Sequence, residues 1–113
     1  MINRGAIVVR LQEPFVCWIN EADPVVDDPG ISLERANEDK TIYLITDDDA
    51  DNLERWLKKN YMTLLEQELE EWYVDEMLWP KNRNRKMFNE WIEIECHSVI
   101  LDTVDGQITD DET

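Results

Sequence analysis

Three aspartates at alternate positions form the clearest metal-binding pattern in this sequence. Asp47, Asp49 and Asp51 match the opening of a calcium-binding loop, whose carboxylates supply oxygen ligands to a hard cation. The match ends there, because the sixth loop position requires glycine and holds Asn52, and the twelfth requires glutamate and holds Lys58. We therefore treat the three aspartates as weak metal candidates. We expect them to begin a helix, because carboxylates stabilise the N-terminus of a helix.

A second group of reactive side chains lies at Cys96, His97 and Ser98. His97 is the single histidine, and beside a thiol or a hydroxyl it could act as a general base. The surrounding residues have the pattern of a strand, however, in which adjacent side chains point to opposite faces and would diverge. The three glycines form no glycine-rich loop that could hold a phosphate. The sequence thus predicts no catalytic residue and no cofactor, and favours a binding protein over an enzyme.

Charge is the strongest compositional signal. The 113 residues include 27 acidic and 11 basic side chains, a formal net charge of -16. Such an excess keeps a protein soluble and steers it towards basic partners, at the cost of self-repulsion. Four of the basic residues, which we call the basic segment, are Lys81, Arg83, Arg85 and Lys86. Because nearby carboxylates would oppose a polyanion, we expect this segment to pair with acids of the same chain or of a second copy, and expect no direct nucleic-acid binding.

Aromatic residues are concentrated just before the basic segment. Trp72, Tyr73 and Trp79 surround a short acidic stretch that includes Asp75 and Glu76. Aromatic anchors inside an acidic rim suit a basic protein partner, since Trp and Tyr are frequent anchors at interfaces. The alternative is that these rings fix the helices to one another, because most large aromatic side chains are buried. The candidate partner-binding residues are Trp72, Tyr73, Asp75, Glu76, Trp79, Lys81, Arg83 and Arg85.

The elements that position these residues follow from the hydropathy pattern. Apolar or alternating runs predict strands at residues 6–11, 15–19, 41–45 and 92–101, the first two forming a hairpin. A strand–helix–strand alternation does not recur along the chain, so we expect these strands to be antiparallel.

Helical spacing predicts helices within residues 50–73 and over residues 82–91. A straight helix over the first of these ranges would place Glu68 and Glu71 on its buried stripe, and a break near residues 60–63 would remove that conflict, so the range holds either one helix or two. The complete order predicts an α+β fold, in which an antiparallel sheet of about four strands carries about three helices packed on one face, in two layers.

We expect a single domain over residues 1–105, followed by an acidic, disordered tail over residues 106–113. The sequence shows no secretory leader and no apolar run long enough for a membrane span, so we expect a cytoplasmic protein without a membrane partner. Cys17 and Cys96 are then expected to be reduced core residues.

Several short runs together carry a resemblance to known sequences. They are Glu-Glu-Trp-Tyr-Val-Asp-Glu-Met-Leu-Trp-Pro-Lys-Asn-Arg at 70–83, Phe-Asn-Glu-Trp at 88–91 and Glu-Cys-His-Ser at 95–98. Over residues 16–105 the chain resembles a group of small acidic uncharacterised bacterial proteins. The resemblance implies a bacterial cytoplasmic origin, and it implies no activity, cofactor or catalytic residue.

Three hypotheses of function remain open at this point. The first is a non-catalytic protein whose acidic surface engages a basic protein partner, or a second copy of the chain. The second is a nucleic-acid mimic that inhibits a DNA-binding protein, with carboxylates in place of phosphates. The third is a metal-dependent or acid–base enzyme with an unidentified carboxylate site. The plainest alternative is that the charge only keeps the protein soluble.

Overall fold

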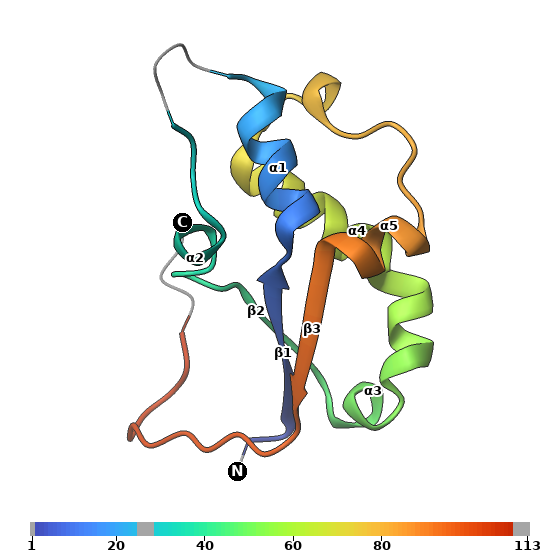
Figure 1. The fold of residues 1–113 in the computed structure, drawn as a ribbon. Helices are drawn as coiled ribbons and strands as arrows, with labels where there is room; N and C mark the ends of the chain where they lie inside the picture. Colours follow the sequence, from blue (N-terminus) through green and yellow to red (C-terminus); the bar gives the residue numbers. More distant parts are fainter. Residues whose placement is uncertain (1, 25–28, 110–113) are drawn as a thin grey trace.

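The computed structural model describes residues 2–24 and 29–109, and these residues form an α+β fold (Figure 1). Within them, three strands make one antiparallel sheet in the order β2-β1-β3, accompanied by five α-helices. In chain order the elements are β1 (Arg4–Leu11), α1 (Glu13–Ala22), α2 (Leu33–Ala36), β2 (Ile42–Thr46), α3 (Asp47–Asp51), α4 (Leu53–Trp72), the 3-10 helix η1 (Glu76–Leu78), α5 (Arg85–Trp91) and β3 (Ile92–His97).

The central strand β1 alternates between buried and more exposed residues. Ile7 and Val9 are buried on one face, whereas Arg10 is exposed on the other. The register pairs Ile7 with Tyr43 of β2 and with Cys96 of β3. The strands predicted in these three places are confirmed, although β3 ends at His97 instead of continuing to residue 101.

Residues 15–19 are helical, so the prediction of a strand there is wrong. They lie in α1, whose first turn holds Pro14, a position at which the missing proline N–H breaks no helical hydrogen bond. Phe15 and Ile19 are buried, whereas Cys17 is exposed, so the apolar residues follow the period of a helix. The expected hairpin with β1 is therefore absent, and Cys17 is not a core residue.

Of the two alternatives for residues 50–73, a break near residues 60–63 does not occur, because α4 runs through these residues without interruption. The helical conformation is instead interrupted at Asn52, between α3 and α4. The buried stripe of α4 includes Glu68, as a straight helix requires. This carboxylate is 3% exposed and accepts a hydrogen bond from the hydroxyl of Tyr43, over 2.6 Å. The bond offsets part of the cost of burying a polar group and links α4 to β2.

The buried Glu68 should make stability depend on pH, because burial raises the pKa of its carboxyl above the ordinary value. Since the pKa is raised in the folded state, the stabilisation is complete below the unfolded-state pKa and is lost as the pH rises through the folded-state value. A Glu68→Gln variant keeps an acceptor for Tyr43 and stays neutral. We expect the unfolding free energy of this variant, measured relative to that of the wild type, to be higher at about pH 8 than at about pH 4.

Urea denaturation at both pH values measures this gain. Glu70→Gln, an exposed position on the same helix, removes the same formal charge and serves as the control. A Glu68→Gln difference that changes with pH no more than that of the control would contradict the prediction.

Two asparagine side chains hold the connection between α1 and β2. Asn37 is buried, and its Oδ1 accepts from the N–H of Leu11 over 2.8 Å while its Nδ2 donates to the carbonyls of Leu11 and Leu33. Asn20 bonds to the N–H and carbonyl of Ile31 in the same way, over 2.8 and 3.0 Å. Each amide thus satisfies backbone groups that would otherwise lack partners at the end of a strand or in a loop.

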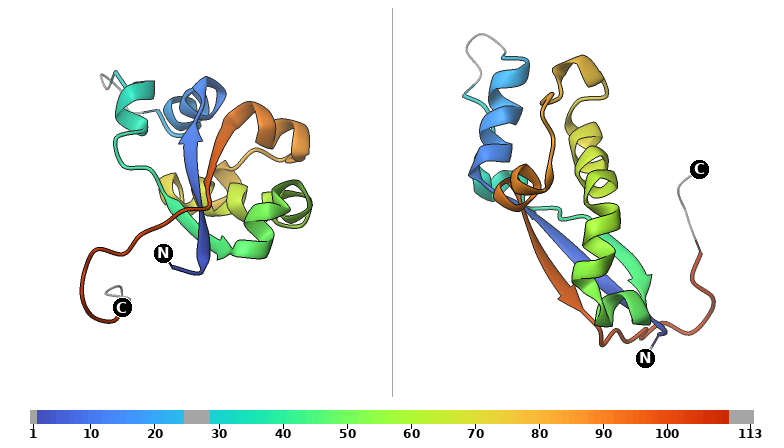
Figure 2. Two further views of the ribbon diagram at one scale, coloured as in Figure 1. Left: turned by 90° about the horizontal axis from the view of Figure 1, so that it is seen from below. Right: turned by 90° about the vertical axis from the view of Figure 1, so that its right-hand side faces the viewer.

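The segment after β3 leaves the sheet without forming a helix or strand (Figure 2). Residues 98–109 are exposed apart from Ile100, whose carbonyl accepts from the N–H of Ile2. The last four residues of the tail that we expected to be disordered, 110–113, lie outside the described residues. Among the helices that the structure describes, none has the length and apolar content needed to cross a lipid bilayer.

Candidate functional site

The basic segment pairs with acids of the same chain. Arg85 on α5 forms an ion pair with Glu54 on α4, with 3.1 Å between Nη1 and Oε1, and its guanidinium lies 6.0 Å from the ring centroid of Tyr61. Arg83 lies 4.0 Å from Glu66, also on α4. The expected pairing within the chain is thereby confirmed for both arginines. Both arginines thus link this segment to α4 through ion pairs that lie at a partly exposed surface.

Arg83 is held by further contacts around its guanidinium. It donates a hydrogen bond to the carbonyl of Pro80 over 2.7 Å, and it lies 5.6 Å from the ring centroid of Trp79. The two lysines of the segment differ from the arginines, since Lys81 and Lys86 are both exposed. Lys86 lies 4.0 Å from Glu90, in the next turn of α5. The arginines of the basic segment are thus structural, and its lysines lie at the surface.

The large aromatic side chains near the segment are used within the molecule. Trp79 is only 6% exposed, and its indole N–H donates to the carbonyl of Tyr73. The hydroxyl of Tyr73 donates to the carbonyl of Ile19, and the indole of Trp18 donates to the carbonyl of Leu78. These bonds fasten the chain between α4 and η1 to α1. Trp79 therefore belongs to the core, which fits the alternative that these rings fix the helices to one another.

Two smaller side chains are the exposed apolar residues of this region. Val74 is 78% exposed and Met77 is 75% exposed. Met77 sits on η1, whose first turn is held because Oδ1 of Asp75 accepts from the N–H of Met77 over 3.0 Å. With their neighbours they border a shallow hollow of about 390 Å³. We define the 70–77 surface as Glu70, Val74, Asp75, Glu76 and Met77.

The 70–77 surface is acidic as well as apolar. Glu70, Asp75 and Glu76 are exposed, and no ion pair in the described part of the chain involves any of them. The nearest basic residue along the chain, Lys81, is exposed and forms no ion pair within the described residues, and the next two, Arg83 and Arg85, are paired with other acids of α4. The surface therefore offers an apolar centre inside uncompensated negative charge. Sequence reasoning selected two of its acids and overlooked Val74 and Met77, which follow no helical period.

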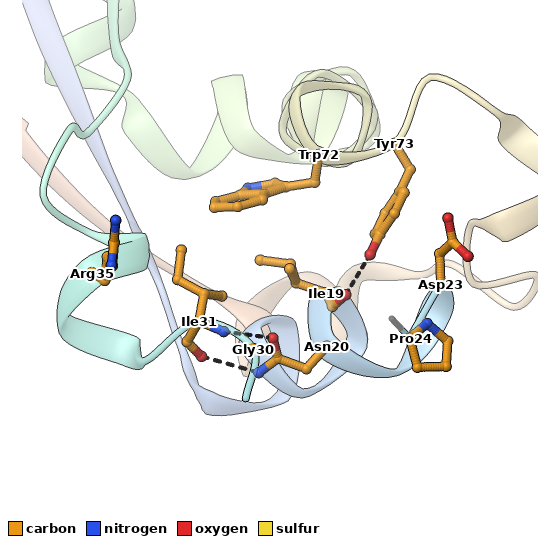
Figure 3. Close-up of a pocket in the computed structure, with 9 residues that line it drawn as sticks. All are labelled: Ile19, Asn20, Asp23, Pro24, Gly30, Ile31, Arg35, Trp72 and Tyr73. Carbon is orange, nitrogen blue, oxygen red and sulfur yellow. Dashed lines mark hydrogen bonds between the residues drawn. The ribbon is translucent and has the colours of Figure 1, made fainter. Parts of the chain in front are cut away.

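A second hollow, of about 570 Å³, lies beside Trp72 at the end of α4 (Figure 3). The ring of Trp72 lies over it, and the hydrogen-bonded pair of Asn20 and Ile31 lies across from the ring (Figure 3). Arg35 and Asp23 stand at opposite ends, so this hollow carries both signs of charge (Figure 3). Its lining residues are Ile19, Asn20, Asp23, Pro24, Gly30, Ile31, Arg35, Trp72 and Tyr73.

The aspartates with the calcium-loop pattern form a short helix. Asp47, Asp49 and Asp51 lie in α3, whose N-terminus is capped by Thr46, with Oγ1 accepting from the N–H of Asp49 over 3.1 Å. The prediction that these acids begin a helix is confirmed. Within residues 2–24 and 29–109, no group of three or more His, Cys, Asp or Glu side chains is placed to hold a metal ion.

The cysteine and histidine of β3 diverge as the strand alternation predicts. Cys96 is half-buried, and burial raises the pKa of its thiol. His97 is exposed, with Nε2 2.9 Å from Oε2 of Glu95, and this hydrogen bond lowers the pKa of the Glu95 carboxyl. Ser98 lies beyond the end of β3. These side chains do not form the nucleophile and base pair that covalent catalysis requires.

Comparisons of the chain with protein-family models, with curated proteins and with solved structures yield no match. Of the two hollows described above, the one on the 70–77 surface combines exposed apolar side chains with charge of a single sign.

Proposed function

We propose that this protein is a non-catalytic binding protein that engages a basic protein partner through the 70–77 surface. The observation that carries the proposal is the exposure of Val74 and Met77 among three carboxylates that form no ion pair with any residue in 2–24 and 29–109. An apolar side chain of the partner would cover Met77, and its Lys or Arg side chains would meet Glu70, Asp75 and Glu76. Such an apolar centre with a charged rim is the usual arrangement of a protein interface.

The two kinds of residue contribute in different ways. Burial of an exposed side chain of this size stabilises a complex by about 1.5–3 kcal/mol, so Val74 and Met77 should supply affinity. The carboxylates and the net charge of -16 should mainly speed the encounter with a basic molecule. Because salt screens this attraction beyond about 8 Å at physiological ionic strength, association should slow as salt is added.

Photocrosslinking at Met77 tests the proposal. With p-benzoylphenylalanine in place of Met77, irradiation of an extract of the source cells should yield a crosslinked protein of basic isoelectric point, in an amount that falls with added salt. The same amino acid in place of Val99, which is 71% exposed, is the matched control and should not capture that protein.

A charge-reversed variant separates the site from general stickiness. Glu70→Lys with Glu76→Lys should lower the crosslinking at Met77 by about tenfold or more, whereas Asp102→Lys with Asp105→Lys in the exposed tail should not. The proposal is wrong if Met77 captures no protein, if it captures an acidic one, or if both charge-reversed variants behave alike.

A further inference from the structure

The outer edge of β2 has backbone groups directed away from the sheet. The order β2-β1-β3 leaves one side of β2 without a neighbouring strand (Figures 1 and 2). The N–H of Val9 donates to the carbonyl of Thr41, so alternate residues of β2, namely Tyr43 and Ile45, direct their backbone groups towards β1. The N–H and carbonyl groups of Ile42 and Leu44 therefore point outward along the open edge.

The same two residues carry exposed apolar side chains. Ile42 is 59% exposed and Leu44 is 56% exposed. The register places them beside Val8 and Ala6, on the sheet face opposite to the buried Ile7. Proteins usually protect an edge strand with a lysine, a proline or a bulge that discourages pairing. The residues of β2 include no proline and no charged side chain, so this edge is open to a further strand.

Acidic side chains stand at both ends of this open edge. Glu38 and Asp39 precede β2, Asp47 and Asp48 follow it, and all four are exposed. The single cation in residues 38–48 is Lys40. A strand added along β2 would therefore have negatively charged side chains near both of its ends.

This charge pattern discriminates between possible occupants. If two copies of β2 paired antiparallel, the acidic start of one strand would lie near the acidic end of the other, and like charges would oppose the pairing. A strand with Lys or Arg at its ends would instead meet acids of opposite charge at both ends of β2.

We propose that the open edge of β2 accepts an extended segment of a basic protein as a fourth strand of the sheet. Backbone hydrogen bonds to Ile42 and Leu44 supply affinity, and alternate apolar side chains of the added strand cover the side chains of these two residues. Basic residues at the two ends of the segment pair with Asp39 and Asp47. This surface is formed by other residues than the 70–77 surface, and neither proposal depends on the other.

Amide hydrogen exchange with a synthetic peptide tests this proposal. The probe is Lys-Arg-Val-Thr-Val-Thr-Val-Arg-Lys, and exchange is followed by NMR on the complete protein. Saturation with the peptide should slow exchange at the N–H groups of Ile42 and Leu44 by about tenfold or more. The N–H groups of Tyr43 and Ile45 already face β1 and should change little. An alternating pattern of this kind is specific to strand addition.

Variants and a control peptide complete the test. Leu44→Lys should abolish the slowing at Ile42, whereas Ile108→Lys, at a residue 66% exposed in the tail, should leave it intact. Met77→Ser should also leave it intact, which separates this result from the crosslinking at Met77. The same peptide with Glu in place of every Lys and Arg should not bind.

Three results would overturn the proposal. The first is unchanged exchange at Ile42 and Leu44 with the basic peptide. The second is equal slowing at Tyr43 and Ile45, which would indicate a general tightening of the fold. The third is slowing that appears without peptide and grows with protein concentration, which would assign the edge to a second copy of the chain.

Discussion

Replacement of Phe15 by alanine is expected to lower the free energy of unfolding by about 3–5 kcal/mol. The ring of Phe15 is completely buried, and it makes edge contacts with Trp18 and Trp91, at 5.4 and 5.6 Å between ring centroids. The substitution removes these contacts and leaves a cavity where α1, α5 and β1 meet in the core. No other single change discussed for this protein should cost as much.

Urea denaturation monitored by tryptophan fluorescence measures this loss. Cys17→Ala, two residues further along α1 and exposed, is the matched control and should change the unfolding free energy by less than about 0.5 kcal/mol. Comparable losses at Phe15 and Cys17 would contradict the helical orientation of this segment.

Replacement of Asn37 by alanine is expected to lower the free energy of unfolding by about 2–4 kcal/mol. The side chain of Asn37 satisfies both the N–H and the carbonyl of Leu11, and its removal would leave these two backbone groups without their partners inside the protein. Each such unsatisfied group costs about 1–3 kcal/mol. The effect is large for a small polar residue because Asn37 completes the end of β1.

Chemical denaturation of two asparagine variants tests this expectation. The control is Asn52→Ala, because the side chain of Asn52 donates a hydrogen bond to the carbonyl of Asp48 at the surface. Its loss should be about 0.5 kcal/mol or less. If Asn37→Ala were no more destabilising than Asn52→Ala, the bonds to Leu11 would not stabilise the fold as described.

The strands could be predicted because their burial alternates along the chain. In β3, Ile92 and Ile94 face inward, whereas Glu93 and Glu95 face solvent, and one face of a sheet against the core produces this pattern directly. The α+β class and the antiparallel sheet are confirmed, but the expected order that led to them was partly wrong, because the structure has helices between both successive pairs of strands and a helix at residues 15–19.

The helix α1 was missed because five consecutive apolar or aromatic residues, at 15–19, are compatible with the period of a helix and with that of a strand. Phe15 and Ile19 are four positions apart and share a helix face, yet the β-branched and aromatic composition favours a strand. In the fold, the ring contacts of Phe15 with Trp91 favour the helix. That contact joins distant parts of the chain and is invisible to a local pattern.

The continuity of α4 could not be predicted for a similar reason. A glutamate on the buried stripe of a helix is unfavourable unless a hydrogen-bond partner is buried with it. That partner is the hydroxyl of Tyr43, which lies 25 positions away in the sequence. The candidate site was predicted in part, since Asp75 and Glu76 lie at the surface as expected. Trp79 is buried and Met77 is the exposed apolar residue, and the sequence left the role of Trp79 open because aromatic size indicates burial as strongly as it indicates binding.

The central position of β1 has a consequence for biosynthesis. β1 is translated before either of its neighbours, and β3 is the last element of the fold to be translated. In a nascent chain, the apolar residues of β1 are therefore without their full set of partners until Ile92–His97 has been added. Such unpaired strands are sites of misassociation, so β1 should be most prone to pair wrongly in the interval before β3 has been added.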